Sequence, residues 1–119
     1  MYKLSFSSLL FIALAQAAFA DPAVIESVRV TQEGGLWSFD VTITHADTGW
    51  DHFSDAWRIL DKDGNQLAIR ELIHPHVDEQ PLTRSLSGIN LPDGITTVGV
   101  QTRDTQSGWH PNIKTVPLR

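Results

Sequence analysis

The chain contains no cysteine, and its only methionine is the initiator, Met1. We therefore expect no disulfide, no thiolate metal ligand and no lipid anchor attached to cysteine. The thioether ligands that Cu(I) carriers use are absent as well. Stability must then come from packing, and any metal site must be built from nitrogen and oxygen donors.

Long apolar runs and positive charge are also scarce. After residue 20, no segment approaches the roughly 20 consecutive apolar residues that a membrane-spanning helix needs, so we expect no membrane span. The chain has 14 Asp and Glu against 9 Lys and Arg, which gives a formal net charge of −5. This acidic balance disfavours nucleic acid and anionic membrane surfaces as partners.

The sequence lacks the motifs of common catalytic sites. It has no Gly-x-Ser-x-Gly turn, no His-Glu-x-x-His pair and no phosphate-binding glycine loop. We therefore expect a binding protein rather than an enzyme. The catalytic alternative that stays open is a reaction assisted by a metal ion or by histidine.

The first 20 residues have the pattern of a secretory signal peptide. Lys3 gives a short positive segment, Leu9 to Ala17 an apolar one, and Ala18-Phe19-Ala20 a small-x-small cleavage site. We predict cleavage before Asp21, a periplasmic or secreted product, and a single domain over residues 21–119. Because cleavage removes Lys3 and no acidic residue, the formal charge falls by one, to −6.

Beyond the signal peptide, apolar and polar residues alternate with the period of a β-strand. The clearest example is Leu36 to His45, where Trp37, Phe39, Val41 and Ile43 are expected to point inward. Nearer the start, Val24, Val28 and Val30 are expected to share a face. No segment of about 10 residues has helical periodicity, so we predict an all-β domain. The predicted strands are 24–31, 36–45, 56–60, 66–73, 82–89, 95–103 and 113–118.

A tryptophan, Trp57, lies in the third predicted strand. Seven short strands in about 100 residues, with a tryptophan in the third, resemble an immunoglobulin-like or fibronectin type III-like domain. The disulfide of antibody domains is absent. The resemblance implies a seven-stranded antiparallel β-sandwich and no particular activity.

In such a domain, successive connections alternate between the two ends. One end receives the turns at 32–35, 61–65 and 90–94, which contain neither histidine nor tryptophan. The other end receives the longer connections that follow the second, fourth and sixth strands. It therefore gathers all five histidines, His45, His52, His74, His76 and His110.

Two histidines and two carboxylates follow one another between Ile73 and Pro81. Imidazole and carboxylate groups suit divalent transition metals, and we predict a Cu or Zn site. The favoured ligands are His74 and His76, with His52 or His110. An oxygen ligand, or a residue that orients a ligand, would come from the acids of the same loop. The full set of metal candidates is His45, His52, His74, His76, His110, Asp78 and Glu79.

The alternative function is recognition of a partner protein, a peptide or a small ligand. Two tryptophans follow glycine near a histidine, in Gly49-Trp50-Asp51-His52 and Gly108-Trp109-His110. Either their rings cover the end of the core or they contact a ligand. Trp50, Asp51 and Trp109 are the predicted contacts in the second case. Loop histidines are also commonly solvated or bonded to the backbone, so both readings stay open.

Overall fold

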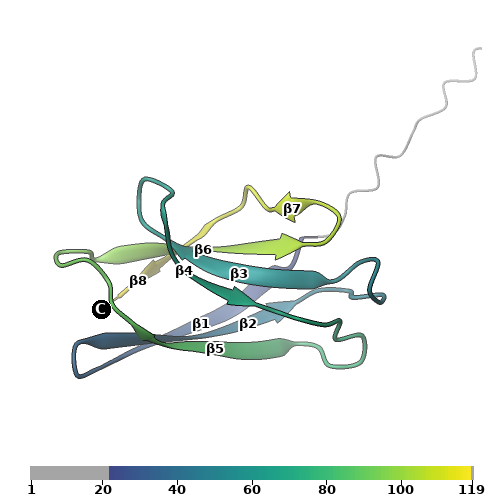
Figure 1. The fold of residues 1–119 in the computed structure, drawn as a ribbon, viewed down its shortest axis with the longest axis horizontal. Helices are drawn as coiled ribbons and strands as arrows, with labels where there is room; N and C mark the ends of the chain where they lie inside the picture. The colour runs from purple at the N-terminus through teal and green to yellow at the C-terminus, as the bar shows by residue number, and fades with distance from the viewer. Residues whose placement is uncertain (1–21, 119) are drawn as a thin grey trace, which may run out of the picture.

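The structure is a computed structural model that describes residues 22–118; the predicted signal peptide, residues 1–20, lies outside the described residues. The described chain is all-β, as predicted, and contains no helix that could cross a membrane. Eight strands form two antiparallel sheets (Figure 1). The strands are β1 (Val24–Glu33), β2 (Leu36–Thr44), β3 (Ser54–Leu60), β4 (Gln66–Glu71), β5 (Leu82–Ile89), β6 (Thr97–Asp104), β7 (Gly108–Trp109) and β8 (Lys114–Pro117).

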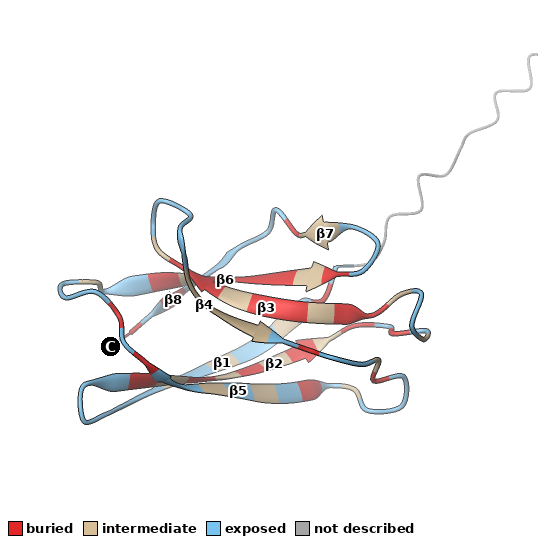
Figure 2. Ribbon diagram, in the orientation of Figure 1, coloured by how far each residue is buried: buried red, intermediate tan, exposed pale blue. Residues whose placement is uncertain are grey.

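The two sheets contain three and five strands. The smaller sheet has the order β1-β2-β5, and the larger one has the order β4-β3-β6, with β7 and β8 both paired to β6. Figure 2 shows buried segments on β2, β3 and β6, and the main apolar cluster takes side chains from both sheets. The core therefore lies between the two layers.

Strand β2 has the side-chain pattern that the sequence predicts. Trp37, Phe39, Val41 and Ile43 are all buried, while the residues between them are half-buried. β2 pairs with β1 on one side and with β5 on the other, and its inward face packs against apolar side chains of the other sheet, such as Trp57 and Val100. The inward register predicted for this strand is confirmed.

Strand β1 departs from the prediction at its start. The register with β2 shifts between Ile25 and Ser27, so Glu26 is an extra residue that reverses the faces of the residues before it. Val24 is consequently 55% exposed, and Ile25 packs against the core together with Val28 and Val30. The inward placement of Val24 was wrong because a period-two pattern does not reveal a β-bulge.

The prediction of seven strands was also wrong, because the described residues contain an additional two-residue strand, β7, in the predicted connection between the last two strands. β7 pairs with Arg103 and Asp104, whereas β8 pairs with the first half of β6. Residues 110–113 span only two residues of β6: the N–H of His110 still donates to the backbone oxygen of Thr102, and the chain after it bulges away from the edge. Pro111 lies in this bulge, and proline lacks the N–H that continued pairing would require.

Candidate metal centre

Three connections meet at one end of the domain, which we call the histidine end: residues 45–53, 72–81 and 105–107 (Figure 1). All strand pairs are antiparallel, so successive connections alternate between the two ends. The short turns at 34–35 and 61–65 lie at the opposite end. The predicted gathering of the loops is confirmed.

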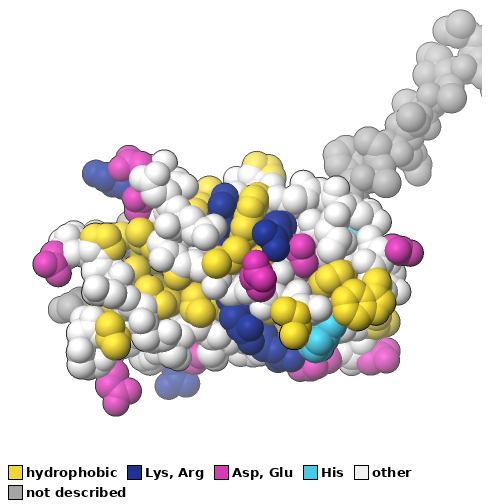
Figure 3. Space-filling view, viewed as in Figure 1, with side chains coloured by type: hydrophobic (Ala, Val, Ile, Leu, Met, Phe, Trp, Pro, Cys, Tyr) yellow, Lys and Arg dark blue, Asp and Glu magenta, His cyan; other side chains and the backbone are white. Residues whose placement is uncertain are grey.

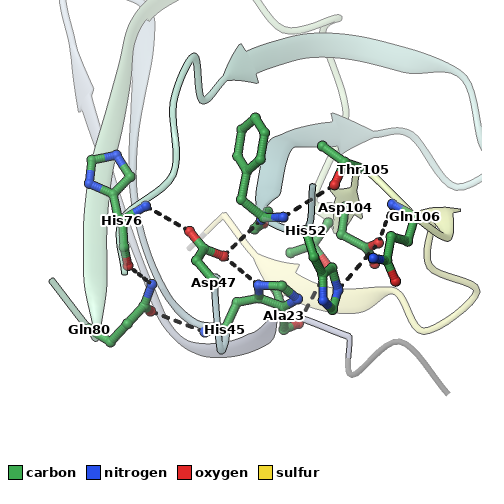
Figure 4. Close-up of polar contacts among 12 residues, drawn as sticks. Ala23, His45, Asp47, His52, His76, Gln80, Asp104, Thr105 and Gln106 are labelled. Carbon is green, nitrogen blue, oxygen red and sulfur yellow. Dashed lines mark hydrogen bonds and ion pairs between the residues drawn. The ribbon is translucent and has the colours of Figure 1, made fainter. Parts of the chain in front are cut away.

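Within the histidine end, His45, His52 and Asp104 come together. Each residue offers one ligand atom, and these three atoms lie within 4.8 Å of one another. His45 follows β2, His52 precedes β3, and Asp104 ends β6, so both sheets contribute to the group (Figure 4). His45 and Asp104 are buried, with exposed fractions of 2% and 1%.

The buried carboxylate of Asp47 fixes the orientation of His45. The Nδ1–H of His45 donates a hydrogen bond to Oδ1 of Asp47 over 2.5 Å. The same carboxylate accepts hydrogen bonds from the backbone N–H groups of Ser54 and His76. An imidazole that donates from Nδ1 carries its lone pair on Nε2, which is the form that binds a metal ion.

Asp104 is held in a similar way. Its Oδ1 accepts hydrogen bonds from the backbone N–H groups of Gln106 and Ser107, and Nε2–H of His110 donates to Oδ2 over 2.6 Å. Burial acts to raise the pKa of Asp104, but the N–H groups of Ser107 and Gln106, together with His110, outweigh it and leave the pKa lowered. The side chain is therefore an ionised carboxylate at neutral pH, the form that ligates metals.

Two nitrogen atoms in this group have no hydrogen-bond partner. Nε2 of His45 and Nε2 of His52 are both shielded from solvent and unpaired. Buried polar atoms are nearly always paired, so two such atoms side by side require an explanation. Nε2 of His52 lies 3.9 Å from Oδ1 of Asp104, and the His45 and His52 ring centroids are 4.8 Å apart.

The spacing of these atoms suits a metal ion. Ligand atoms bonded to zinc at about 2.1 Å are separated by roughly 3.4 Å in a tetrahedral site. Nε2 of His52 and Oδ1 of Asp104 would therefore have to approach each other by about half an ångström, and ligand atoms at the 4.8 Å limit of the group by about 1.4 Å. Two imidazole nitrogens and one carboxylate oxygen fit a divalent transition metal that favours nitrogen and oxygen donors.

The favoured pair from the sequence, His74 and His76, lies outside this group. Their rings are 4.5 Å apart; His74 is exposed, and His76 is buried with Nδ1 3.2 Å from Oε2 of Glu79. Arg84, followed by His76, lowers the pKa of Glu79, although desolvation opposes them. Asp78 is exposed. Within residues 22–118, the group of three metal-ligating residues that forms is His45, His52 and Asp104.

The predicted recognition residues occupy three different settings. Trp50 is 70% exposed, and its ring is nearly perpendicular to the Phe53 ring, with the ring centroids 5.8 Å apart. Asp51 is exposed, and its backbone oxygen accepts hydrogen bonds from the 105–107 connection. Trp109 lies against the guanidinium groups of Arg58 and Arg103, whose carbons are 3.9 and 4.9 Å from its ring centre.

Three residues of this site were not proposed as ligands or orienting groups from the sequence: Asp47, Gln80 and Asp104. Asp104 is the last residue of β6 and precedes Thr105, a position that alone does not distinguish it from a turn aspartate. The signal that was present is its place at the histidine end. Its burial, which separates it from an ordinary turn residue, depends on packing.

Comparison with known proteins gives few relatives. No known family model matches the chain. Over 86 residues it is 35% identical to a protein of Halomicrobium mukohataei named "Putative lipoprotein", and the match covers 72% of this chain and 42% of that protein. The chain thus spans less than half of this relative's length.

One solved structure shares the fold. The crystal structure of hypothetical protein PH1083 from Pyrococcus horikoshii OT3 superimposes with a TM-score of 0.56 over 84% of this chain and 92% of that one. The sequences are 11% identical, so this likeness concerns the fold alone.

Proposed function

We propose that this protein is an exported binding domain that holds one divalent transition metal ion, zinc or copper, between His45, His52 and Asp104. The observation that carries the proposal is the pair of buried, unpaired Nε2 atoms beside an ionised carboxylate. A metal ion at their centre would satisfy both nitrogens at once.

A purely structural role explains less of the arrangement. Hydrogen bonds between buried histidine and aspartate stabilise many folds, and such a role would account for the His45–Asp47 and His110–Asp104 pairs. It does not account for the two Nε2 atoms, since each leaves a buried polar atom unsatisfied at a cost of about 1–3 kcal/mol. Metal binding uses these same atoms.

Export and an immunoglobulin-like sandwich belong to the same proposal. Export is supported by the signal pattern of residues 1–20 and by the name of the Halomicrobium relative. The sandwich is supported by the core between the two sheets and by the pairing of β7 and β8 with one strand, β6. If β7 and β8 are two parts of one strand, the seven-stranded arrangement is recovered.

Titration of the cleaved protein, residues 21–119, with zinc tests the proposal. We expect uptake of one ion per chain, measured by calorimetry and by elemental analysis of protein purified without an affinity tag. The double variant His74→Ala/His76→Ala should retain this uptake, because the two side chains lie outside the group of three. Loss of uptake in this variant would mean that His74 or His76 is a ligand, as the sequence predicts. Absence of uptake by the unmodified protein would refute metal binding.

A second candidate function, recognition of a partner protein, is favoured by exposed apolar side chains. Trp50, Ile73 and Val77 are 70%, 76% and 52% exposed, and all three belong to the histidine end. Figure 3 shows hydrophobic side chains beside a histidine at this end. Exposed aromatic residues on loops are common anchors of protein interfaces.

This recognition function predicts an effect of Trp50→Ala. A partner retained by the immobilised protein should bind the variant at least about 30-fold more weakly, the loss typical of an interface anchor. Leu36→Ala is the matched control, because Leu36 is 45% exposed but lies beside the turn at the opposite end. Equal weakening by both variants would argue against a specific role of Trp50.

A further inference from the structure

The Asp47 carboxylate joins three separate segments. Oδ1 accepts hydrogen bonds from Nδ1–H of His45 and from the backbone N–H of Ser54, while Oδ2 accepts one from the backbone N–H of His76 over 2.9 Å. The side chain is 1% exposed. Asp47 therefore connects the end of β2 and the start of β3 with the connection 72–81.

Gln80 closes a second link between the same partners. Its Oε1 accepts a hydrogen bond from the backbone N–H of His45 over 3.1 Å, and its Nε2–H donates to the backbone oxygen of His76 over 2.9 Å. His76 is thus held at its N–H by Asp47 and at its C=O by Gln80. Figure 4 shows this closed circuit of His45, Asp47, His76 and Gln80.

Two exposed apolar residues of the connection 72–81 lie close in sequence to His76, the residue whose backbone Asp47 and Gln80 bind. Val77 directly follows His76, and Ile73 lies three residues before it. Both side chains are more than half exposed, so they contribute little packing that could fix the loop. Leu72 anchors the start of this segment in the core, and beyond it the polar links to Asp47 and Gln80 are major restraints on the order of the loop.

We infer that Asp47 is a positioning residue for the metal centre and that, through it, metal binding stabilises the conformation of 72–81. The inference rests on the proposed function, because it takes His45 as a ligand. A metal bond at Nε2 restrains the imidazole, and this restraint passes through Nδ1–H to the carboxylate that holds the His76 amide. By linkage, if the metal raises the affinity of the loop for a partner by some factor, that partner raises the affinity of the site for the metal by the same factor.

Asparagine at position 47 separates positioning from simple packing. Its amide group has the shape of the carboxylate but carries two donor hydrogens. If the amide nitrogen faces His45, it donates to Nδ1 and moves the imidazole proton to Nε2, which removes the metal-binding lone pair. In the other orientation the amide nitrogen faces the backbone N–H of His76, and because both groups are donors this hydrogen bond is lost. Either orientation breaks one arm of the circuit.

Hydrogen exchange with and without saturating zinc tests this inference on the cleaved protein. Zinc should slow exchange of the 72–81 amides, the His76 amide above all, by about 5-fold or more. Asp47→Asn should bind zinc about 10- to 100-fold more weakly, and its loop should lose this protection even when zinc is saturating. His76→Ala is the control, since it retains the backbone N–H and should retain the protection.

The outcomes separate the inference from the function on which it rests. Calorimetry on the same samples shows whether zinc binds. Zinc binding without any change in the exchange of 72–81, or Asp47→Asn with unaltered affinity, would overturn the coupling and leave the metal site standing. If no zinc binds to the unmodified protein, both proposals fail. Should Asp47→Asn not fold, Gln80→Ala, which cuts the other link, is expected to reduce the protection by zinc.

Discussion

Replacing His52 by alanine is expected to lower zinc affinity by at least about 100-fold, because loss of a direct ligand should cost no less than loss of a residue that orients one. His52 is the most informative ligand to remove. Its Nε2 makes no hydrogen bond, so the substitution leaves no protein partner of that atom unsatisfied. His45→Ala, in contrast, would leave the buried Asp47 carboxylate without one of its donors.

Thermal unfolding gives a second measure of the same variant. At a zinc concentration 100 times the dissociation constant, a ligand that binds only the folded state stabilises it by about 2.7 kcal/mol. Zinc should therefore raise the melting temperature of the unmodified protein and hardly change that of His52→Ala. Asp51→Asn, next to it and exposed, should behave like the unmodified protein. Equal zinc-induced shifts in His52→Ala and the unmodified protein would remove His52 from the site.

The second large effect is expected in the core. Trp57 is 0% exposed and is the largest of the fully buried side chains. It lies in the middle of β3, which pairs with β4 on one side and β6 on the other, so no neighbouring strand is free to close over a void. Trp57→Ala should lower the free energy of unfolding by about 3–5 kcal/mol. A domain of this size has only about 5–15 kcal/mol in total, so the loss is large.

Urea denaturation of the cleaved protein measures this loss. Trp50→Ala is the matched control, because it makes the same chemical change at a side chain that is 70% exposed. Its free energy of unfolding should change by no more than about 0.5 kcal/mol. Similar losses of free energy of unfolding for the two variants would contradict the prediction that the burial of Trp57 makes a large contribution to stability.

The fold could be predicted from sequence wherever the alternation ran uninterrupted. β2 is the best case, since its four buried apolar residues alternate strictly and the strand is paired along both edges. The errors lie where one strand gains residues relative to its neighbour, at Glu26 in β1 and between β7 and β8. Such insertions are set by pairing across the sheet, which a pattern along one strand does not contain.

The candidate metal centre could be predicted only in part, for a related reason. The alternation of connections correctly brought the histidines to one end, and His45 and His52 were among the candidates. The sequence favoured His74 and His76 because they are close in sequence, whereas the structure groups side chains that lie up to 59 residues apart by number, His45 and Asp104. Which imidazoles converge depends on side-chain direction at strand ends, which the shifted register between Ser54 and Ala56 alters.

The interrupted border beside β6, which β7 and β8 form, has a consequence for solubility. An uninterrupted strand at the border of a sheet presents a row of free N–H and C=O groups to which another molecule can add its own strand. On the side of β6 that faces away from β3, the border consists of a two-residue and a four-residue piece separated by a bulge, with Pro111 and Pro117 each lacking a donor. Two molecules that meet along this border would find no continuous ladder to extend, which protects this cysteine-free domain against aggregation through this side.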